Sequence, residues 1–158
     1  MKILAIDPGP EQSGYVVWYD DHIVKKGKID NHSVLDVLMN HSRCHVVIEM
    51  IASYGMPAGK SLFETAFWIG RFYQYGCYSS IVDRVFRKDV KMWLCGSTRA
   101  KDGNVRQALI DRYGKPGTKK TPNHIYDDAD KGNKMSGDIW AALAVATYWQ
   151  ESDGGKKE

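Results

Sequence analysis

The chain has 158 residues, of which 43% are hydrophobic and 11% aromatic, and its formal net charge is +3. This length predicts one domain with a sizeable core, which we place at residues 1–150, and a flexible tail at 151–158. The sequence has no run of 18 apolar residues and no signal-peptide pattern, so we expect neither a membrane span nor secretion. The three cysteines are never spaced as C-x-x-C, which argues against a zinc site or a disulfide framework and favours a cytoplasmic protein.

Positive charge is concentrated in one segment, residues 84–120. This segment holds eleven Lys or Arg residues and three Asp residues, a net charge of +8, so the rest of the chain carries −5. One basic face on an otherwise acidic body is typical of a protein that binds a polyanion. A solvated pair of charged helices is the alternative interpretation.

The expected elements follow from apolar periodicity and from the turn residues between the apolar runs. In chain order, they are strands at 2–6, 14–19 and 22–29, a short helix capped by Ser33, a strand at 45–49, a helix at 61–75, a strand at 80–86, helices at 88–93 and 104–113, a loop at 114–133, and a helix from Ser136 to about Gln150. This order predicts a mixed α/β sheet with an antiparallel hairpin on one side and parallel crossovers on the other.

Two of the buried strands end at a carboxylate. The run ILAID ends at Asp7, just before a Pro-Gly turn, and the run HVVIE ends at Glu49. A carboxylate at the rim of a core costs desolvation energy unless it is paired or binds a metal. If the two strands are parallel neighbours, Asp7 and Glu49 converge at the edge where open α/β sheets bind ligands. The alternative for Asp7 is an ordinary turn aspartate.

A third candidate acid, Asp138, lies in the first turn of the C-terminal helix, where interaction with the helix dipole is the alternative explanation. Asp7, Glu49 and Asp138 together suit a hard divalent cation such as Mg²⁺, for which Mn²⁺ can substitute. Two such ions can activate a water and stabilise the leaving oxygen of a phosphodiester. The acids alone fit phosphoryl transfer from a nucleotide equally well, and the basic segment favours a nucleic acid.

Four segments, in this order, resemble the RuvC family of Holliday-junction resolvases in the RNase H-like superfamily: ILAIDPGPEQSGYVVW, HVVIEM, RKDVKMWLCGSTRAKDGNVRQAL and DIWAALAVA. The loops look more like those of a phage-type member of the family than those of a bacterial housekeeping member. The resemblance implies an α/β, RNase H-like fold with a five-stranded mixed sheet flanked by helices. It also implies a homodimer that nicks four-way (Holliday) or related branched DNA with Mg²⁺, a crossover junction endodeoxyribonuclease. Asp7, Glu49 and Asp138 match catalytic, metal-binding acids of the family.

The resemblance further implies contacts to DNA. Lys91 and Lys101 match lysines that would contact phosphates or stabilise the transition state, with Lys101 and Asp102 in swapped order. Tyr54 lies near the place of an aromatic that would stack on an unpaired base. Ordinary surface side chains are the alternative for each of them. The expected catalytic lysine is Lys101, and the expected DNA-binding residues are Tyr54, Arg87, Lys88, Lys91, Arg99, Lys119 and Lys120.

Position 141 departs from the family pattern. The resemblance implies a second acid three residues after Asp138 on the same helix face, but this chain has Ala141. Three interpretations are open: a site with three carboxylates, a substitute acid from the preceding loop, or an inactivating replacement of Asp by Ala. The substitute acids considered are Asp127, Asp128 and Asp130. The alternative function is therefore a junction-binding protein with weak or abolished cleavage.

The helix at 61–75 is apolar over more of its circumference than one packing face requires. We expect its second face to pack on a twofold-related copy, with the small Gly70 allowing close approach. A third hypothesis, an actin-like kinase or ATPase, needs a second duplicated domain for which 158 residues leave no room. The stretch GMPAGKS fails as a phosphate loop, because three residues rather than four separate Gly55 from Gly59.

Overall fold

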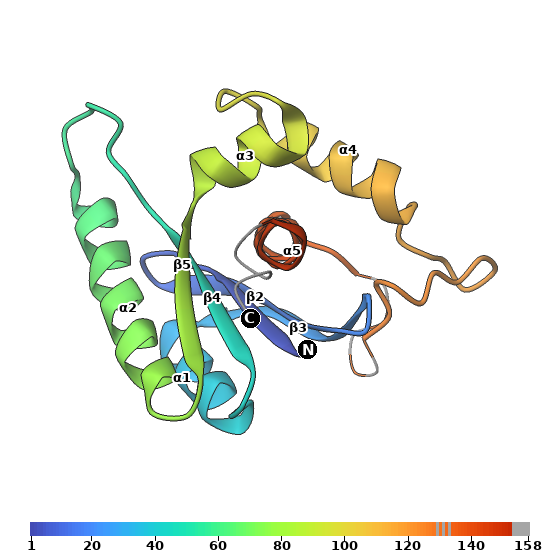
Figure 1. Cartoon of the computed structure of the whole chain (residues 1–158), viewed down its shortest axis with the longest axis horizontal. Coiled ribbons are helices and arrows are strands. Elements are labelled where there is room, and N and C mark those ends of the chain that lie inside the picture. Colours follow the sequence, from blue (N-terminus) through green and yellow to red (C-terminus); the bar gives the residue numbers. More distant parts are fainter. Residues whose placement is uncertain (129, 131, 133, 153–158) are drawn as a thin grey trace.

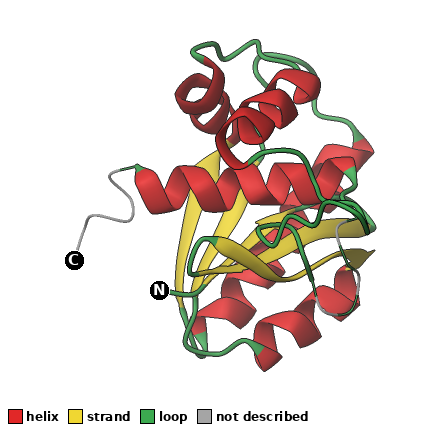
Figure 2. Cartoon of the chain, turned by 90° about the vertical axis from the view of Figure 1, so that its right-hand side faces the viewer, coloured by secondary structure: helices red, strands yellow, loops and turns green. Residues whose placement is uncertain are grey.

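The computed structural model describes residues 1–128, 130, 132 and 134–152. In these residues, one five-stranded sheet carries helices on both of its faces (Figures 1 and 2). The strands are β1 (Ile3–Asp7), β2 (Gln12–Tyr19), β3 (His22–Asp30), β4 (His45–Met50) and β5 (Ile81–Phe86). The helices are α1 (Asn31–Asn40), α2 (Lys60–Cys77), α3 (Arg87–Cys95), α4 (Asp102–Tyr113) and α5 (Gly137–Glu151).

The sheet is mixed, with the strand order β3-β2-β1-β4-β5. β1 pairs antiparallel with β2, and β2 pairs antiparallel with β3. β4 runs parallel to both β1 and β5, because α1 and α2 carry the chain back between these strands. The predicted five-stranded mixed sheet is therefore confirmed, including the hairpin side and the parallel pairing of the two strands that end in acids.

Alternation along the central strands divides the core between the two faces. In β1, Leu4 and Ile6 pack into a cluster with apolar residues of α1 and α2, whereas Ile3 and Ala5 pack into a cluster with α5. This follows from the two-residue period of a strand. Asp7 continues the second series and so points to the α5 face.

Helix α5 lies between the sheet and the pair α3–α4, at the centre of the view in Figure 1. Because it is covered on both sides, every residue from Ala142 to Thr147 is buried. Ala142 and Ala146, which lie on the same side of the helix as Asp138, are small and allow it to sit close to the strands. The sequence-predicted helix from Ser136 is confirmed, with Ser136 as the N-cap residue.

Two local predictions need correction. Asp30, not Ser33, caps α1: the Asp30 carboxylate accepts hydrogen bonds from the Ser33 backbone N–H at 3.0 Å and from its hydroxyl at 2.5 Å. The predicted tail at 151–158 starts too early, because Glu151 ends α5 and pairs with Arg112 at 2.5 Å. Residues 153–158 lie outside the described residues. Of the described helices, none has both the length and the apolar character needed to cross a membrane.

Candidate active site

A row of aligned residues crosses the sheet on the α5 face. Lys28 of β3 pairs with Gly14 of β2, and Gly14 pairs with Asp7 of β1. The parallel ladder between β1 and β4 brings Glu49 alongside Asp7. Paired residues of neighbouring strands point to the same face of a sheet, so Lys28, Asp7 and Glu49 share one surface.

Gly14 has no side chain, and this allows α5 to approach the sheet closely between Asp7 and Lys28. A Cβ atom built on Gly14 would lie 2.5 Å from the carbonyl oxygen of Asp138 and 2.7 Å from its Cβ. Only glycine tolerates a backbone this close, so Gly14 sets the height of the α5 N-terminus above the sheet. Asp138 is thereby held over β2, between Asp7 on one side and Lys28 on the other.

The Asp138 carboxylate pairs with Lys28. The distance between Lys28 Nζ and Asp138 Oδ2 is 2.7 Å, and the two side chains are 44% and 40% exposed. The hydrogen bond from Lys28 and the negative charge of Asp138 raise the pKa of the lysine. In this arrangement Lys28 draws Asp138 toward the β3 side of the row.

The two acids of the row, Asp7 and Glu49, share the guanidinium of Arg87, the first residue of α3. Arg87 Nη1 lies 2.9 Å from Glu49 Oε1 and 3.8 Å from Asp7 Oδ1. Its Nη2 lies 2.7 Å from Asp102 Oδ1, and Lys91 Nζ lies 3.9 Å from the same oxygen. Arg87 is thus one positive charge placed among three carboxylates. The hydrogen bond from Arg87 also lowers the pKa of Asp102.

Burial makes the central pair of acids costly to ionise. Burial and then the charge of Glu49 raise the pKa of Asp7 to about 8, against the opposing effect of Arg87. Burial likewise raises the pKa of Glu49, and Arg87 lowers it. The side chains are 12% and 6% exposed. A cation between these two carboxylates would remove much of the penalty.

Five of the predicted DNA-binding residues gather beside these acids. Together with Thr98, they line a pocket of about 300 Å³: Tyr54, Arg87, Lys88, Lys91 and Arg99. Tyr54 is 60% exposed and adopts a left-handed backbone conformation with φ +50° in the loop between β4 and α2. Arg87 belongs to both groups, so the basic pocket adjoins the carboxylates directly.

The other predicted DNA-contacting residues, Lys101, Lys119 and Lys120, do not line this pocket. Lys101 is the exposed N-cap residue of α4, and its backbone N–H donates to Asn104 Oδ1 at 2.9 Å. In the described residues no carboxylate pairs with its side chain, and the next residue, Asp102, reaches Arg87 instead. Lys119 and Lys120 belong to the loop after α4. Figure 1 shows this loop on the opposite side of the molecule from the loop between β4 and α2. The basic segment 84–120 is therefore not one continuous face.

Of the three loop acids predicted as substitutes for a fourth carboxylate, Asp128 is engaged with backbone groups. Asp128 is buried, and its two oxygens accept hydrogen bonds from the backbone N–H groups of Lys26 at 2.7 Å and Asp130 at 2.8 Å. The bond from Lys26 fixes the loop to β3, and the bond from Asp130 lies within the loop. Besides burial, the charges that shift the pKa of Asp7 are those of Glu49, Arg87, Asp138 and Asp102. Ala141 lies one turn beyond Asp138 on α5 and is partly exposed.

Sequence reasoning missed three residues of this site: Gly14, Lys28 and Asp102. Counting the hairpin register back from the turn at Asp20-Asp21 pairs Gly14 with Gly27, and an irregularity between Val17 and Trp18 shifts the partner to Lys28, so the residues alone carried no signal for this pair. The swapped order of Lys101 and Asp102 was the only signal for Asp102. Within the described ranges, no three His, Cys, Asp or Glu side chains form a metal-binding group. In this structure the acids that sequence analysis predicted as ligands are paired instead with cations of the chain, Asp7 and Glu49 with Arg87 and Asp138 with Lys28.

Comparisons with known proteins identify the fold. No protein-family model matches the sequence, and neither does any curated protein. The structure is similar to RuvC of Thermus thermophilus, with a TM-score of 0.65 and 16% sequence identity over 95% of this chain and 96% of that chain. It is equally similar to T. thermophilus RuvC in complex with Holliday junction substrate, with a TM-score of 0.65 and 15% identity over the same shares. The chain therefore has a RuvC-like, RNase H-like fold, as the sequence predicted.

Proposed function

We propose that this protein is a metal-dependent, structure-selective endodeoxyribonuclease that nicks four-way (Holliday) or related branched DNA. The observation that carries the proposal is the position of the buried pair Asp7 and Glu49. They lie at the carboxyl ends of parallel strands, beneath Asp138 and directly beside a basic pocket that contains Tyr54. The RuvC-like fold supports it, because one similar structure is a complex with Holliday junction substrate.

The donor set fits Mg²⁺, with Mn²⁺ as a substitute, because Asp7, Glu49 and Asp138 offer the oxygen ligands that these ions prefer. The guanidinium held between Asp7 and Glu49 marks a place where positive charge is favourable. Bound Mg²⁺ would supply Lewis acidity and a more acidic bound water. Asp7 and Glu49 would hold it, and Asp138 would join them on leaving Lys28.

The chain's own residues would bind and orient the strand. Lys88, Lys91 and Arg99 present positive charge in the pocket next to the acids, where they would contact backbone phosphates. The exposed ring of Tyr54 in the same pocket would stack on an unpaired base at the branch point. Arg87 Nη2 can keep its hydrogen bond to Asp102 while Nη1 leaves Glu49 and turns toward a phosphate.

Helix α2 supports the proposal that the protein acts as a homodimer. Its outward face carries exposed aromatic rings at Phe63 and Phe67, which are 65% and 60% exposed. Gly70 lies in the same helix, and a Cβ added there would meet open space. A patch of this kind marks an interaction site. Two copies related by a twofold axis would present two sites for paired nicks on a symmetric junction.

A second candidate function is junction binding with weak or no cleavage. Ala141 in place of a fourth acid favours it, and so do the ion pairs that hold Glu49 to Arg87 and Asp138 to Lys28. This alternative keeps the basic pocket and its DNA but lacks a site that binds metal.

The decisive experiment compares nicking of four-way junction, fork and duplex DNA of matched sequence, with Mg²⁺ or Mn²⁺, by the wild type and by Asp7→Asn. We expect metal-dependent nicks in branched DNA by the wild type only, with binding retained in Asp7→Asn. Binding without nicks over a range of metal concentration and pH would favour the second candidate. Absence of both binding and nicks would refute the proposal as a whole.

A further inference from the structure

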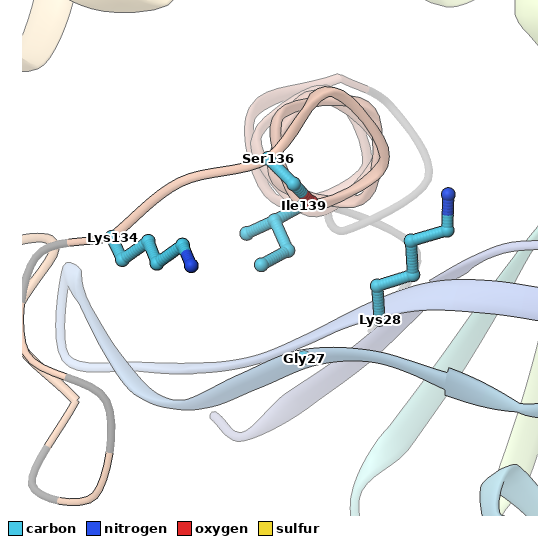
Figure 3. A pocket seen from close by; sticks show the side chains of 5 residues that line it. All are labelled: Gly27, Lys28, Lys134, Ser136 and Ile139. Carbon is cyan, nitrogen blue, oxygen red and sulfur yellow. The ribbon is translucent and has the colours of Figure 1, made fainter.

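A second pocket lies on the β3 side of Asp138, away from Glu49. It has a volume of about 460 Å³ and is lined by Gly27, Lys28, Lys134, Ser136 and Ile139. Figure 3 shows Lys28 rising from β3 on one side and Lys134 reaching in from the loop before α5 on the other, with Ser136 and Ile139 between them. None of these residues lines the pocket around Tyr54.

The hydroxyl of Ser136 points to a missing ligand. Its Oγ is buried and has no hydrogen-bond partner in the described structure, although Ser136 is the N-cap residue of α5. N-cap serines usually bond to a backbone N–H of the first turn, but this one makes no such bond. A buried hydroxyl without a partner is costly, so a ligand with hydrogen-bonding oxygens would stabilise it.

The charges around the pocket favour an anion. Lys28 uses one bond to hold Asp138, and an ammonium group has three donors, so two remain for a ligand. Lys134 is exposed, and in the part of the chain that the structure describes no acid pairs with it. The N-terminus of α5 adds its positive dipole end at Ser136. Two lysines, a hydroxyl and a helix N-terminus are the chemistry that recognises a phosphate.

The position of the pocket relates it to the candidate active site. Lys28 and Asp7 stand in one row with Gly14 between them, two strand spacings or about 10 Å apart. A DNA strand advances about 3.4 Å per nucleotide along its axis. A strand with one phosphate at Asp7 and Glu49 would therefore place another, a few nucleotides away, within reach of Lys28.

We propose that the pocket formed by Lys28, Lys134 and Ser136 binds a backbone phosphate of the DNA strand a few nucleotides from the one to be cut. The inference rests on the proposed function and adds a second anchoring point that fixes the direction of the strand across α5. Its role is positioning, because none of the three residues would touch the reacting phosphate.

The test pairs a protein variant with a chemical change in the DNA. Single methylphosphonates, which remove the charge of one phosphate, are placed in turn along each strand of a four-way junction, and affinity is measured in metal-free buffer for the wild type, Lys134→Gln and Ser136→Ala. Lys2→Gln is the matched control, because Lys2 is an exposed lysine beside the N-terminal end of β1, away from both pockets. Thermal melting of each variant checks the fold.

We expect one methylphosphonate position to weaken wild-type binding about fivefold and to have little further effect on Lys134→Gln. Lys134→Gln should also lower the slope of log K against log salt by about 1, and Lys2→Gln should not. The inference is wrong if the wild type and Lys134→Gln lose affinity equally at every methylphosphonate position, or if Lys134→Gln behaves like Lys2→Gln.

The outcomes separate this inference from the proposed function. A wild type that binds and nicks junctions, together with a Lys134→Gln variant of unchanged salt slope, overturns the pocket alone. A wild type that binds no DNA overturns both. An added arm measures inorganic phosphate and a mononucleotide by NMR at the Ser136 amide. Lys134-dependent binding of these ions without any coupling in the junction would identify a small-anion site and refute the role in strand binding.

Discussion

Replacement of Gly14 by alanine tests how α5 is positioned over the sheet. The new Cβ would lie 2.5, 2.6 and 2.7 Å from the carbonyl oxygen, carbonyl carbon and Cβ of Asp138, whereas ordinary contacts begin at 3.4 Å. The N-terminus of α5 must therefore rise by roughly 1 Å, because β2 is held by paired strands on both sides. We expect a loss of about 1–3 kcal/mol in the free energy of unfolding.

The same displacement moves Asp138 relative to Asp7. A shift of about 1 Å in a catalytic group can cost about 100-fold in rate, so under the proposed function Gly14→Ala should lose nicking by that order. The assays are urea unfolding and nicking of a four-way junction. The control is Gly103→Ala, the same change in α4 where a Cβ meets open space, which should be neutral or slightly stabilising. A Gly14→Ala protein as stable and as active as the wild type would refute the close approach of α5 as the feature that positions the site.

Three further predictions address the acids and the proposed dimer. The pKa of Asp7 is raised in the folded state to about 8, so its contribution to stability is complete below the unfolded value of 3.8 and is lost as the pH rises toward 8. At about 1.4 kcal/mol for each pKa unit, Asp7→Asn should therefore exceed the wild type in stability by roughly 5 kcal/mol at pH 8 without metal, in urea unfolding, and the two should converge near pH 4. Ala141→Asp adds a carboxylate one turn from Asp138 on a partly exposed surface. If the site lacks a fourth ligand, this variant should raise Mg²⁺-dependent nicking at least tenfold. Equal nicking rates for the variant and the wild type would mean that three acids suffice. Phe67→Glu should convert a dimer to a monomer in sedimentation equilibrium. The control Met39→Glu changes an apolar position of similar exposure on α1 and should leave the dimer intact. A wild type that is already monomeric would contradict the proposed α2 interface.

Local patterns were sufficient for the fold and for the central acid pair. Apolar runs that end in Asp7 and Glu49 define strands, and parallel pairing then places both residues at one edge without any knowledge of side-chain contacts. The helices and strands with expected bounds lie within about two residues of those bounds. The N-cap of α1 was mistaken because Asp30 and Ser33 both suit a cap, and the path of β3 into the helix decides between them.

The partners of the acids could not be predicted, because they depend on geometry between distant segments. On a helix, adjacent residues are rotated by about 100°, so the choice between Lys101 and Asp102 facing Arg87 depends on where α4 begins. The approach of Lys28 to Asp138 depends on strand register and on the height of α5 above Gly14. Lys119 and Lys120 are near Lys101 in sequence, but α4 is about 18 Å long and carries the chain away from the site.

Charge balance explains how this group of acids is stable in the folded chain and what metal binding would require. Asp7, Glu49 and Asp102 are held by Arg87, and Asp138 is held by Lys28. A metal ion must therefore compete with cations of the chain itself, which lowers its apparent affinity as long as those ion pairs persist. DNA phosphates are the natural alternative partners for Arg87 and Lys28. Under the proposed function, a bound strand would therefore release the carboxylates from these two cations. The metal would then bind more tightly in the presence of DNA than in its absence. This coupling is reciprocal: Mg²⁺ would strengthen DNA binding by the same factor, even though added salt otherwise weakens such binding.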